Sequence, residues 1–271
     1  MKKNIYIGDI HGRNTWKQIV ETHSDADNII FIGDYFDSFD VSGIEQLMNA
    51  EEIVHFKKEQ EQDPLKKVYL LIGNHDLHYW PGIKWRGNTS GFQPKMVHQF
   101  EYFFRENEKM FQLAVKIGNN LCTHAGVSSV FLKDTGYWTY DTHNTGNIKH
   151  DTHNDESHIV EFLNDLLHYK PNEFDFGACQ DRHYGLMVLD PYGNDEQQSP
   201  IWIRPKSLQK SNKNSDLKHM YVQIVGHTQQ EEIDIEGKST GGRYFYIDTL
   251  SKGEYLIEEN NKFKIGRLWE K

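Results

Sequence analysis

Three short apolar runs near the start of the chain each end in glycine. They cover residues 4–8, 28–33 and 67–73 and are rich in isoleucine, leucine and valine. Nearly continuous apolar runs of this length are typical of strands that are buried on both faces. Between them lie two segments, 14–23 and 43–62, whose apolar residues recur at three- and four-residue spacing and predict helices. The alternation of strand and helix predicts an α/β fold with a mainly parallel sheet and helices outside it.

Further periodic segments follow along the chain. Residues 95–109 and 157–170 have the spacing of amphipathic helices. Short apolar runs predict more strands at 111–118, 120–126, 220–226, 243–249, 253–259 and 262–266. The segment at about 130–200 is more polar, and Asp-Thr-His-Asn occurs twice within it, which we interpret as a solvated loop rather than a metal-binding tract. We expect one domain over residues 1–271, with an insertion at about 130–200 that caps the substrate site.

Composition and charge narrow the classes of function. The chain has 271 residues, 37% of them apolar and 26% charged, which is typical of a globular protein. Its formal net charge of −10 argues against a sequence-independent grip on nucleic acid, which needs a basic surface. The two cysteines form no pattern of a disulfide framework or a zinc site. Asp9 interrupts the first apolar run, and no stretch is long enough for a membrane span, so we expect a cytoplasmic protein without a membrane partner.

Several predicted strands end in residues that can bind metals. These residues are Asp9 and His11, Asp34, Asn74 and His75, His124, and His227. Ligands of open α/β sheets bind at the carboxyl ends of the strands, so we expect these side chains to converge at one edge of the sheet. Asp34, Asp37 and Asp40 also crowd the end of the second strand, and so much negative charge at a buried strand end requires a cation nearby. One such strand end is a weak signal, whereas five together are a strong one.

These segments resemble the motifs of a known family. Gly-Asp-Ile-His-Gly, Gly-Asp-Tyr-Phe-Asp, Gly-Asn-His-Asp, Thr-His-Ala-Gly and Gly-His-Thr follow one another as in the calcineurin-like metallophosphoesterases. The resemblance covers the chain from Ile5 to about Thr249, without the segment at 130–200. It is closest to the branch that holds protein Ser/Thr phosphatases and symmetrical diadenosine tetraphosphatases. It implies an αββα sandwich, with central mixed β-sheets flanked by helices, and two divalent metal ions (Mn, Fe or Zn), of which we favour Mn.

The resemblance also implies the metal ligands. For the first metal they are Asp9 and His11, for the second Asn74, His124 and His227, and Asp34 bridges the two. Carboxylate, amide and imidazole groups suit Mn, Fe and Zn. A water shared by two such ions can lose its proton near neutral pH, because one bound ion alone can lower the pKa of water to about 7. The implied reaction is direct in-line attack of a metal-bridging hydroxide on phosphorus, without a phospho-enzyme.

Three further residues have roles by resemblance. His75 is the general acid that protonates the leaving-group oxygen. Asp37 accepts a hydrogen bond from His75 and keeps it oriented and protonated. Asp76 is expected to steady the loop behind the ligands. Asp40 has no assigned role.

The sequence departs from its relatives at the phosphate clamp. In the phosphatase motif an arginine follows the second aspartate, whereas this chain has Ser38 followed by Phe39. The candidates for its replacement are Arg13, Arg86 and Arg204. We favour Arg204, because Trp-Ile-Arg resembles a segment found ahead of Gly-His-Thr in smaller bacterial and phage enzymes. Many relatives outside this branch have a second histidine where this chain has Gln229, which favours the phosphatase and tetraphosphatase branch.

We therefore expect a metal-dependent phosphomonoesterase that acts on a phosphoprotein, a nucleotide or a small phosphorylated molecule. The alternatives among enzymes are a symmetrical dinucleoside tetraphosphate hydrolase and a phosphodiesterase, although Leu250 replaces the usual glycine after Ile-Asp-Thr. A non-catalytic scaffold on the same fold is the alternative outside enzymes, but such relatives lose metal ligands or the acid, and this chain keeps them all. Candidates for a pocket in the insertion are Tyr137, Trp138 and Tyr140.

Overall fold

The computed structural model describes residues 2–84, 86–87, 89–137, 158–178, 190–238 and 240–269. Both Asp-Thr-His-Asn segments, Trp138, Tyr140 and Cys179 lie outside these residues, so the capping role of the insertion stays a prediction. Within the described ranges, no helix is both long enough and apolar enough to cross a lipid bilayer.

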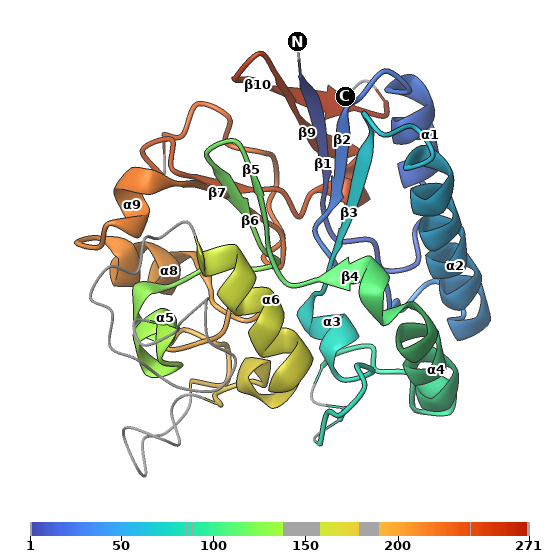
Figure 1. Cartoon of the computed structure of the whole chain (residues 1–271), viewed down its shortest axis with the longest axis horizontal. Coiled ribbons are helices and arrows are strands. Elements are labelled where there is room, and N and C mark those ends of the chain that lie inside the picture. The colour runs from blue at the N-terminus through green and yellow to red at the C-terminus, as the bar shows by residue number, and fades with distance from the viewer. Residues whose placement is uncertain are drawn as a thin grey trace.

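The described strands form two mixed sheets (Figure 1). The first sheet has the order β10-β9-β1-β2-β3-β4 and the second β5-β6-β7-β8. Strands β1 to β4 run parallel, as do β6 to β8, whereas β5, β9 and β10 are antiparallel to their neighbours. The strands are Lys3–Ile7 (β1), Asn28–Phe31 (β2), Lys67–Leu71 (β3), Phe111–Gln112 (β4), Val115–Ile117 (β5), Asn120–Cys122 (β6), Val222–Val225 (β7), Tyr244–Tyr246 (β8), Glu254–Glu259 (β9) and Lys262–Arg267 (β10).

The helices lie outside the two sheets (Figure 1). Helices α1, α2 and α4 accompany the first sheet, and α8 and α9 accompany the second. The helices are Trp16–Thr22 (α1), Gly43–Gln60 (α2), Asn74–Leu77 (α3), Val97–Asn107 (α4), Ser129–Asp134 (α5), Ile159–Tyr169 (α6), Pro205–Asn212 (α8) and Leu217–Met220 (α9). Turns of 3-10 helix cover Pro94–Met96, Glu108–Met110, Pro171–Phe174 and Leu250–Lys252. This arrangement confirms the expected αββα sandwich.

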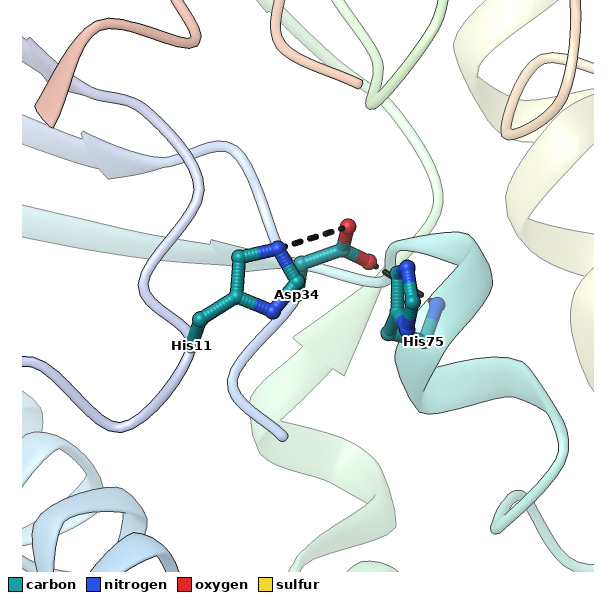
Figure 2. A group of neighbouring side chains, drawn as sticks. All are labelled: His11, Asp34 and His75. Carbon is teal, nitrogen blue, oxygen red and sulfur yellow. Dashed lines mark hydrogen bonds and ion pairs between the residues drawn. The ribbon is translucent and has the colours of Figure 1, made fainter. Parts of the chain in front are cut away.

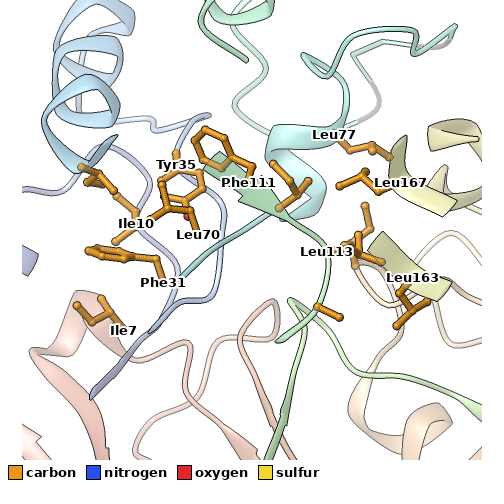
Figure 3. Packing of buried hydrophobic residues seen from close by; sticks show 14 of the residues in the cluster. Ile7, Ile10, Phe31, Tyr35, Leu70, Leu77, Phe111, Leu113, Leu163 and Leu167 are labelled. Atoms are coloured by element: carbon orange, nitrogen blue, oxygen red, sulfur yellow. The ribbon is translucent and has the colours of Figure 1, made fainter. Parts of the chain in front are cut away.

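The central strands are buried on both faces, as their apolar runs predict. Successive side chains of a strand point to opposite faces of its sheet. In β1, Ile5 and Ile7 therefore pack with Phe31 in the large cluster that includes the helices (Figure 3). Tyr6 points the other way, into a cluster that it shares with Ile224 of the second sheet. The two sheets are thus held together by the inner faces of their strands.

The prediction of one strand over residues 111–118 is wrong. Strand β4 pairs with β3 of the first sheet, whereas β5 pairs with β6 of the second, so the chain changes sheets at Leu113 and Ala114. The side-chain oxygen of Asn164 accepts hydrogen bonds from the backbone N–H groups of Leu113 (2.9 Å) and Ala114 (3.0 Å). Its amide nitrogen donates to the carbonyl oxygen of Ala114 (3.1 Å). At this crossing, Asn164 of α6 thus provides hydrogen bonds to backbone N–H and carbonyl groups that have no partner in a neighbouring strand.

Replacement of Asn164 by alanine is expected to destabilise the fold. It removes the side-chain partner of the two N–H groups, whereas the carbonyl oxygen of Ala114 keeps its hydrogen bond from Nε2 of Gln112 (2.7 Å). The free energy of unfolding should therefore fall by about 1–3 kcal/mol. Urea unfolding of the wild type and the variant measures this change. His168→Ala on the same helix is the control, because it removes only an exposed pair with Glu108 and should leave the unfolding midpoint nearly unchanged. Equal midpoints for Asn164→Ala and the wild type would contradict the assigned role.

Candidate metal centre

The residues that follow the strands meet between the two sheets. Asp9 and His11 come after β1, and Asp34 comes after β2. Asn74 begins α3 directly after β3, while His124 and His227 follow β6 and β7 of the second sheet. The sequence analysis predicts that these side chains converge at one edge of a single sheet. In the structure, they come instead from the carboxyl ends of parallel strands in both sheets.

Asp34 lies at the centre of this cluster and is almost fully buried. One carboxylate oxygen lies 3.2 Å from Nε2 of His124 and 3.7 Å from Nε2 of His11, and the other accepts a hydrogen bond from the backbone N–H of His75 (2.9 Å) (Figure 2). Two groups of residues could each hold a metal ion. Within each group, the possible ligand atoms lie within 4.8 Å of one another. One group is His11, Asp34 and His75, and the other is Asp9, Asp34 and His124. Asp34 belongs to both, so its carboxylate is placed where two cations could share it.

Hydrogen bonds to the backbone orient the imidazoles of His11 and His124. Nδ1 of His11 lies 2.8 Å from the carbonyl oxygen of Phe36, and Nδ1 of His124 lies 2.9 Å from that of Ile32. A carbonyl oxygen can only accept, so each Nδ1 carries the proton and each Nε2 keeps its lone pair. Both lone-pair nitrogens face Asp34, as metal ligands would.

The amide of Asn74 links the two sheets. Its side-chain oxygen lies 3.0 Å from Nε2 of His124 and 2.9 Å from Nδ1 of His227. Nε2 of His227 donates to the carbonyl oxygen of Trp202 (3.0 Å), so Nδ1 of His227 keeps the lone pair. An amide oxygen and two imidazole lone pairs therefore point at one place.

Glycines next to the ligands make room for the carboxylates. A Cβ on Gly73 would lie 2.0 Å from Oδ1 of Asp34, and a Cβ on Gly226 would lie 2.0 Å from Oδ1 of Asp9. Only glycine avoids both clashes, which explains why these strands end in glycine before a ligand. Asp34 (φ 55°) is itself held in the left-handed backbone region, where side chains other than glycine carry strain.

Asp76 holds the tight turns together from behind the cluster. Its carboxylate accepts hydrogen bonds from the backbone N–H groups of Asp34 (2.7 Å), Tyr35 (2.8 Å) and Gly73 (2.9 Å). Asp76 thereby ties the turn after β2 to the turn after β3, which is the loop-steadying position that its place in the motif implies.

Asp37 has more hydrogen-bond partners than the one, His75, that the sequence analysis assigned to it. Its carboxylate lies 3.1 Å from Nδ1 of His75 and 2.8 Å from Nε2 of His78, and it accepts hydrogen bonds from the hydroxyls of Tyr79 (2.5 Å) and Thr89 (3.0 Å). His78 could have been found from its position three residues after His75, on the same side of the helical turn. Nothing in the sequence pattern marks Thr89, which reaches Asp37 only through tertiary packing.

A cavity of about 200 Å³ opens beside His11 and His75. The side chains around it are polar, apart from Phe39. The residues that line it are His11, Arg13, Asp37, Ser38, Phe39, Asp40, His75, Ser90, Gln229, Asp248 and Ser251. Gln229 is therefore part of the cavity wall. Asp248, which follows β8, is a strand-end carboxylate for which the sequence analysis gave no role.

The structure separates the three candidate arginines. Arg13 lines the cavity. Arg204 donates to the side-chain oxygen of Thr228 (3.1 Å) and to the carbonyl oxygen of His227 (3.3 Å), which places its guanidinium beside a ligand candidate. Neither Arg204 nor Arg86 is among the described residues that line the cavity, and Arg86 pairs with Glu101 of α4 (2.9 Å).

Of the other residues that the sequence analysis singled out, Tyr137 belongs to the core, whereas Ser38 lines the cavity. Tyr137 is fully buried, and its ring lies edge-on to Phe162 of α6 with 5.2 Å between centroids, so it is part of the core. Ser38 is also buried. Its hydroxyl accepts hydrogen bonds from the backbone N–H groups of Asp40 and Val41 (both 3.2 Å). Ser38 thus shapes the turn that an arginine occupies in the phosphatase motif.

The electrostatics of the cluster favour a bound cation. Burial, together with the charges of Asp248 and Asp34, holds the pKa of Asp9 well above its usual range. Burial and the charge of Asp34 raise the pKa of Asp248 to about 6. Carboxylates in this position are costly to ionise without a counter-charge, which a divalent ion would supply. The oxygen and nitrogen donors are those that Mn, Fe or Zn accept, so the residues fit such an ion.

Comparison with known proteins identifies the class to which the sandwich and its cluster belong. A family model described as calcineurin-like phosphoesterase matches residues 4–230. The chain therefore belongs to this family of metal-dependent hydrolases of phosphate esters.

Two other comparisons add little to this assignment. A metallophosphoesterase structure from Sphaerobacter thermophilus is 12% identical with a TM-score of 0.28, and the match covers 52% of this chain and 57% of that one. A likeness at this level carries no argument about substrate. No curated protein matches the chain.

The metal-free protein is expected to lose stability as the pH rises through the pKa of Asp248. The folded-state pKa of about 6 lies above the ~4 of an unfolded aspartate, so the folded state holds this proton more tightly. The resulting stabilisation is complete below about pH 4 and is lost as the pH rises past about 6.

Unfolding of metal-stripped wild type and Asp248→Asn across this interval measures the effect. The stability of the wild type relative to the variant should fall as the pH rises, and added Mn²⁺ should restore it above about pH 6. A relative stability that stays constant across the interval would contradict the prediction.

Proposed function

We propose that this chain is a dinuclear-metal-dependent phosphohydrolase that cleaves phosphomonoesters in the manner of the protein Ser/Thr phosphatases. The observation that carries the proposal is the position of Asp34, whose carboxylate belongs to both groups of possible metal ligands. A carboxylate shared by two ions is the core of a two-metal site. Two bound divalent ions, with Mn favoured, would polarise the phosphoryl oxygens and activate a water as the nucleophile.

The proposed ligands divide into two sets that share Asp34. As the resemblance implies, Asp9 and His11 would hold the first ion together with Asp34. The groups of neighbouring donor atoms divide differently, since His11 lies with His75 and Asp9 lies with His124 around the shared Asp34. Asn74, His124 and His227 hold the second ion, which the convergence of their donor atoms supports. The second-sheet residues enter this set only because β6 and β7 end opposite β2 and β3.

His75 is proposed as the general acid. Its Nδ1 is engaged by Asp37 at 3.1 Å, which leaves Nε2 to donate a proton to the leaving-group oxygen. Burial alone would lower the pKa of His75, but the charges of Asp34 and Asp37 outweigh it and raise the pKa above its usual value. The raised pKa favours the protonated imidazole that a general acid needs.

Arg204 and Arg13 are proposed to hold the phosphoryl group in place of the missing clamp. Burial lowers the pKa of Arg204, whereas the charges of Asp9 and Asp248 oppose that effect, so its guanidinium faces the acidic cluster. Arg13 approaches from the cavity wall. The positive charges of the two arginines would offset the charge that builds on the phosphoryl oxygens during the reaction.

A symmetrical dinucleoside tetraphosphate hydrolase is the second candidate. Asp248 of the Ile-Asp-Thr segment lines the cavity, and Gln229 stands in its wall where other branches have a ligand histidine. Two features favour a monoester instead. The cavity is small, and the carboxylates of Asp40 and Asp248 in its lining oppose the additional negative charge of a polyphosphate.

Hydrolysis of an aryl phosphomonoester and the matching diester tests the proposal. Metal-stripped protein should regain activity with Mn²⁺, and Asp34→Asn should lower kcat/KM by at least about a hundredfold, because it removes the shared carboxylate. Asp25→Asn, which changes an exposed carboxylate, is the matched control. Faster hydrolysis of the diester than of the monoester would instead support the phosphodiesterase hypothesis. Activity that is independent of metal and of Asp34 would rule out the two-metal proposal.

A second experiment separates the arginines. Arg204→Lys keeps a positive charge but loses the forked donors, so kcat/KM should fall by roughly ten- to a hundredfold. Arg86→Lys should change kcat/KM by less than about twofold, because its partner is Glu101. Steady-state kinetics with one aryl phosphomonoester compares the two variants. A larger loss in Arg86→Lys than in Arg204→Lys would reverse the assignment.

A further inference from the structure

Phe39 is an exposed aromatic side chain in the wall of the proposed catalytic cavity. Its exposed fraction is 80%, the highest value among the large apolar side chains of the described residues, shared with Leu65. Phe39 lines the same cavity as His75, Asp37 and Arg13. A large apolar surface left open at a functional cavity is typical of a contact that a ligand completes.

The backbone around Phe39 is fixed, although its ring is exposed. The neighbouring Ser38 is buried, and its hydroxyl accepts hydrogen bonds from the backbone of Asp40 and Val41. The tip of the ring lies close to Gly91, where an added Cβ would stand 3.5 Å from Cζ of Phe39. The backbone that carries the ring is therefore fixed at the cavity by a short, hydrogen-bonded turn, which lowers the entropy cost of using the ring as a contact surface.

Phe39 belongs to the side of the cavity where the leaving group would lie. It follows Asp37 by two residues, and Asp37 holds His75, the proposed donor to the leaving-group oxygen. The carboxylates of Asp40 and Asp248, which also line the cavity, disfavour a leaving group that carries further phosphate. An uncharged, flat leaving group fits both the ring and the acidic surroundings.

We propose that Phe39 is a stacking surface for a ring on the leaving group, so that the preferred substrates are phosphomonoesters of phenolic alcohols or nucleosides. The proposal rests on the proposed phosphohydrolase function and deepens it. Aromatic pairs stack in offset or edge-to-face geometry and contribute specificity beyond the area that they bury. Phe39 is in this sense a specificity-determining residue, and it stands where the phosphatase motif has glycine.

Binding of phosphonates to the Mn²⁺-loaded protein tests the stacking without requiring turnover. Calorimetry would compare phenylphosphonate with methylphosphonate, which differ in the ring and share the metal-binding group. Wild type should bind phenylphosphonate more tightly, and Phe39→Leu should weaken that preference by about three- to tenfold. Phe39→Tyr keeps the ring and should retain the preference. Tyr102→Leu, which removes an exposed aromatic from α4, should leave both affinities unchanged.

Hydrolysis then identifies the source of the ring. For wild type and Phe39→Leu, kcat/KM would be measured with phosphotyrosine, adenosine monophosphate and glycerol phosphate. The variant is compared with the wild type on each substrate separately, so that differences in leaving-group reactivity cancel. The variant should lose about three- to tenfold more with one or both ring substrates than with glycerol phosphate. The substrate with the larger loss tells a phenyl ring from a nucleobase.

The outcomes separate the two proposals. Phosphonate preference that depends on Phe39, in a protein that hydrolyses none of the esters, would support the stacking surface and overturn the phosphohydrolase. Equal affinity of Phe39→Leu and wild type for phenylphosphonate, equal weakening of both phosphonates, or no binding of either would overturn the stacking proposal.

Discussion

The structure depends on one buried carboxylate, that of Asp34, which lies at the junction of two sheets. It is 1% exposed, so water cannot compensate its charge. Burial alone would raise the pKa of Asp34, but the neighbouring imidazoles of His124 and His75 outweigh this effect and hold the pKa below its usual range. The neighbours of Asp34 come from both sheets, since Asp9 and His11 follow β1 of the first sheet and His124 follows β6 of the second. A pair of divalent ions would complete this compensation.

Positioning such a carboxylate requires a backbone that few residues tolerate. Asp34 has a positive φ. Because Gly73 has no side chain, the carboxylate of Asp34 can occupy the space beside it. Asp76 balances the strain by accepting three backbone N–H groups from the two adjoining turns. Stability and site geometry therefore rest on the same contacts, which is why glycine and aspartate recur together at the strand ends.

The turn after Asp37 shows how the site has been reshaped relative to the phosphatase motif. The hydroxyl of Ser38 accepts hydrogen bonds from the backbone of the turn, while Arg13 lines the cavity and Arg204 lies beside His227. Phe39 then turns its ring toward the opening rather than the core. The turn thus carries a buried hydroxyl and an exposed ring where the phosphatase motif has arginine and glycine.

The sequence alone determined the strand ends and the residues that follow them, because a glycine-terminated apolar run and its next polar residues are local features. It also predicted the parallel core and the helices α1, α2, α4 and α6, since burial imposes a period that can be read directly, but it did not predict the short helices α3, α5, α8 and α9. Only the tertiary structure decided that the ligands come from two sheets, that Leu113 and Ala114 cross between them, that Thr89 reaches Asp37, and that Arg86 pairs with Glu101. These features join residues far apart in the chain, and no local pattern records which distant partner satisfies a buried charge or an unpaired backbone group.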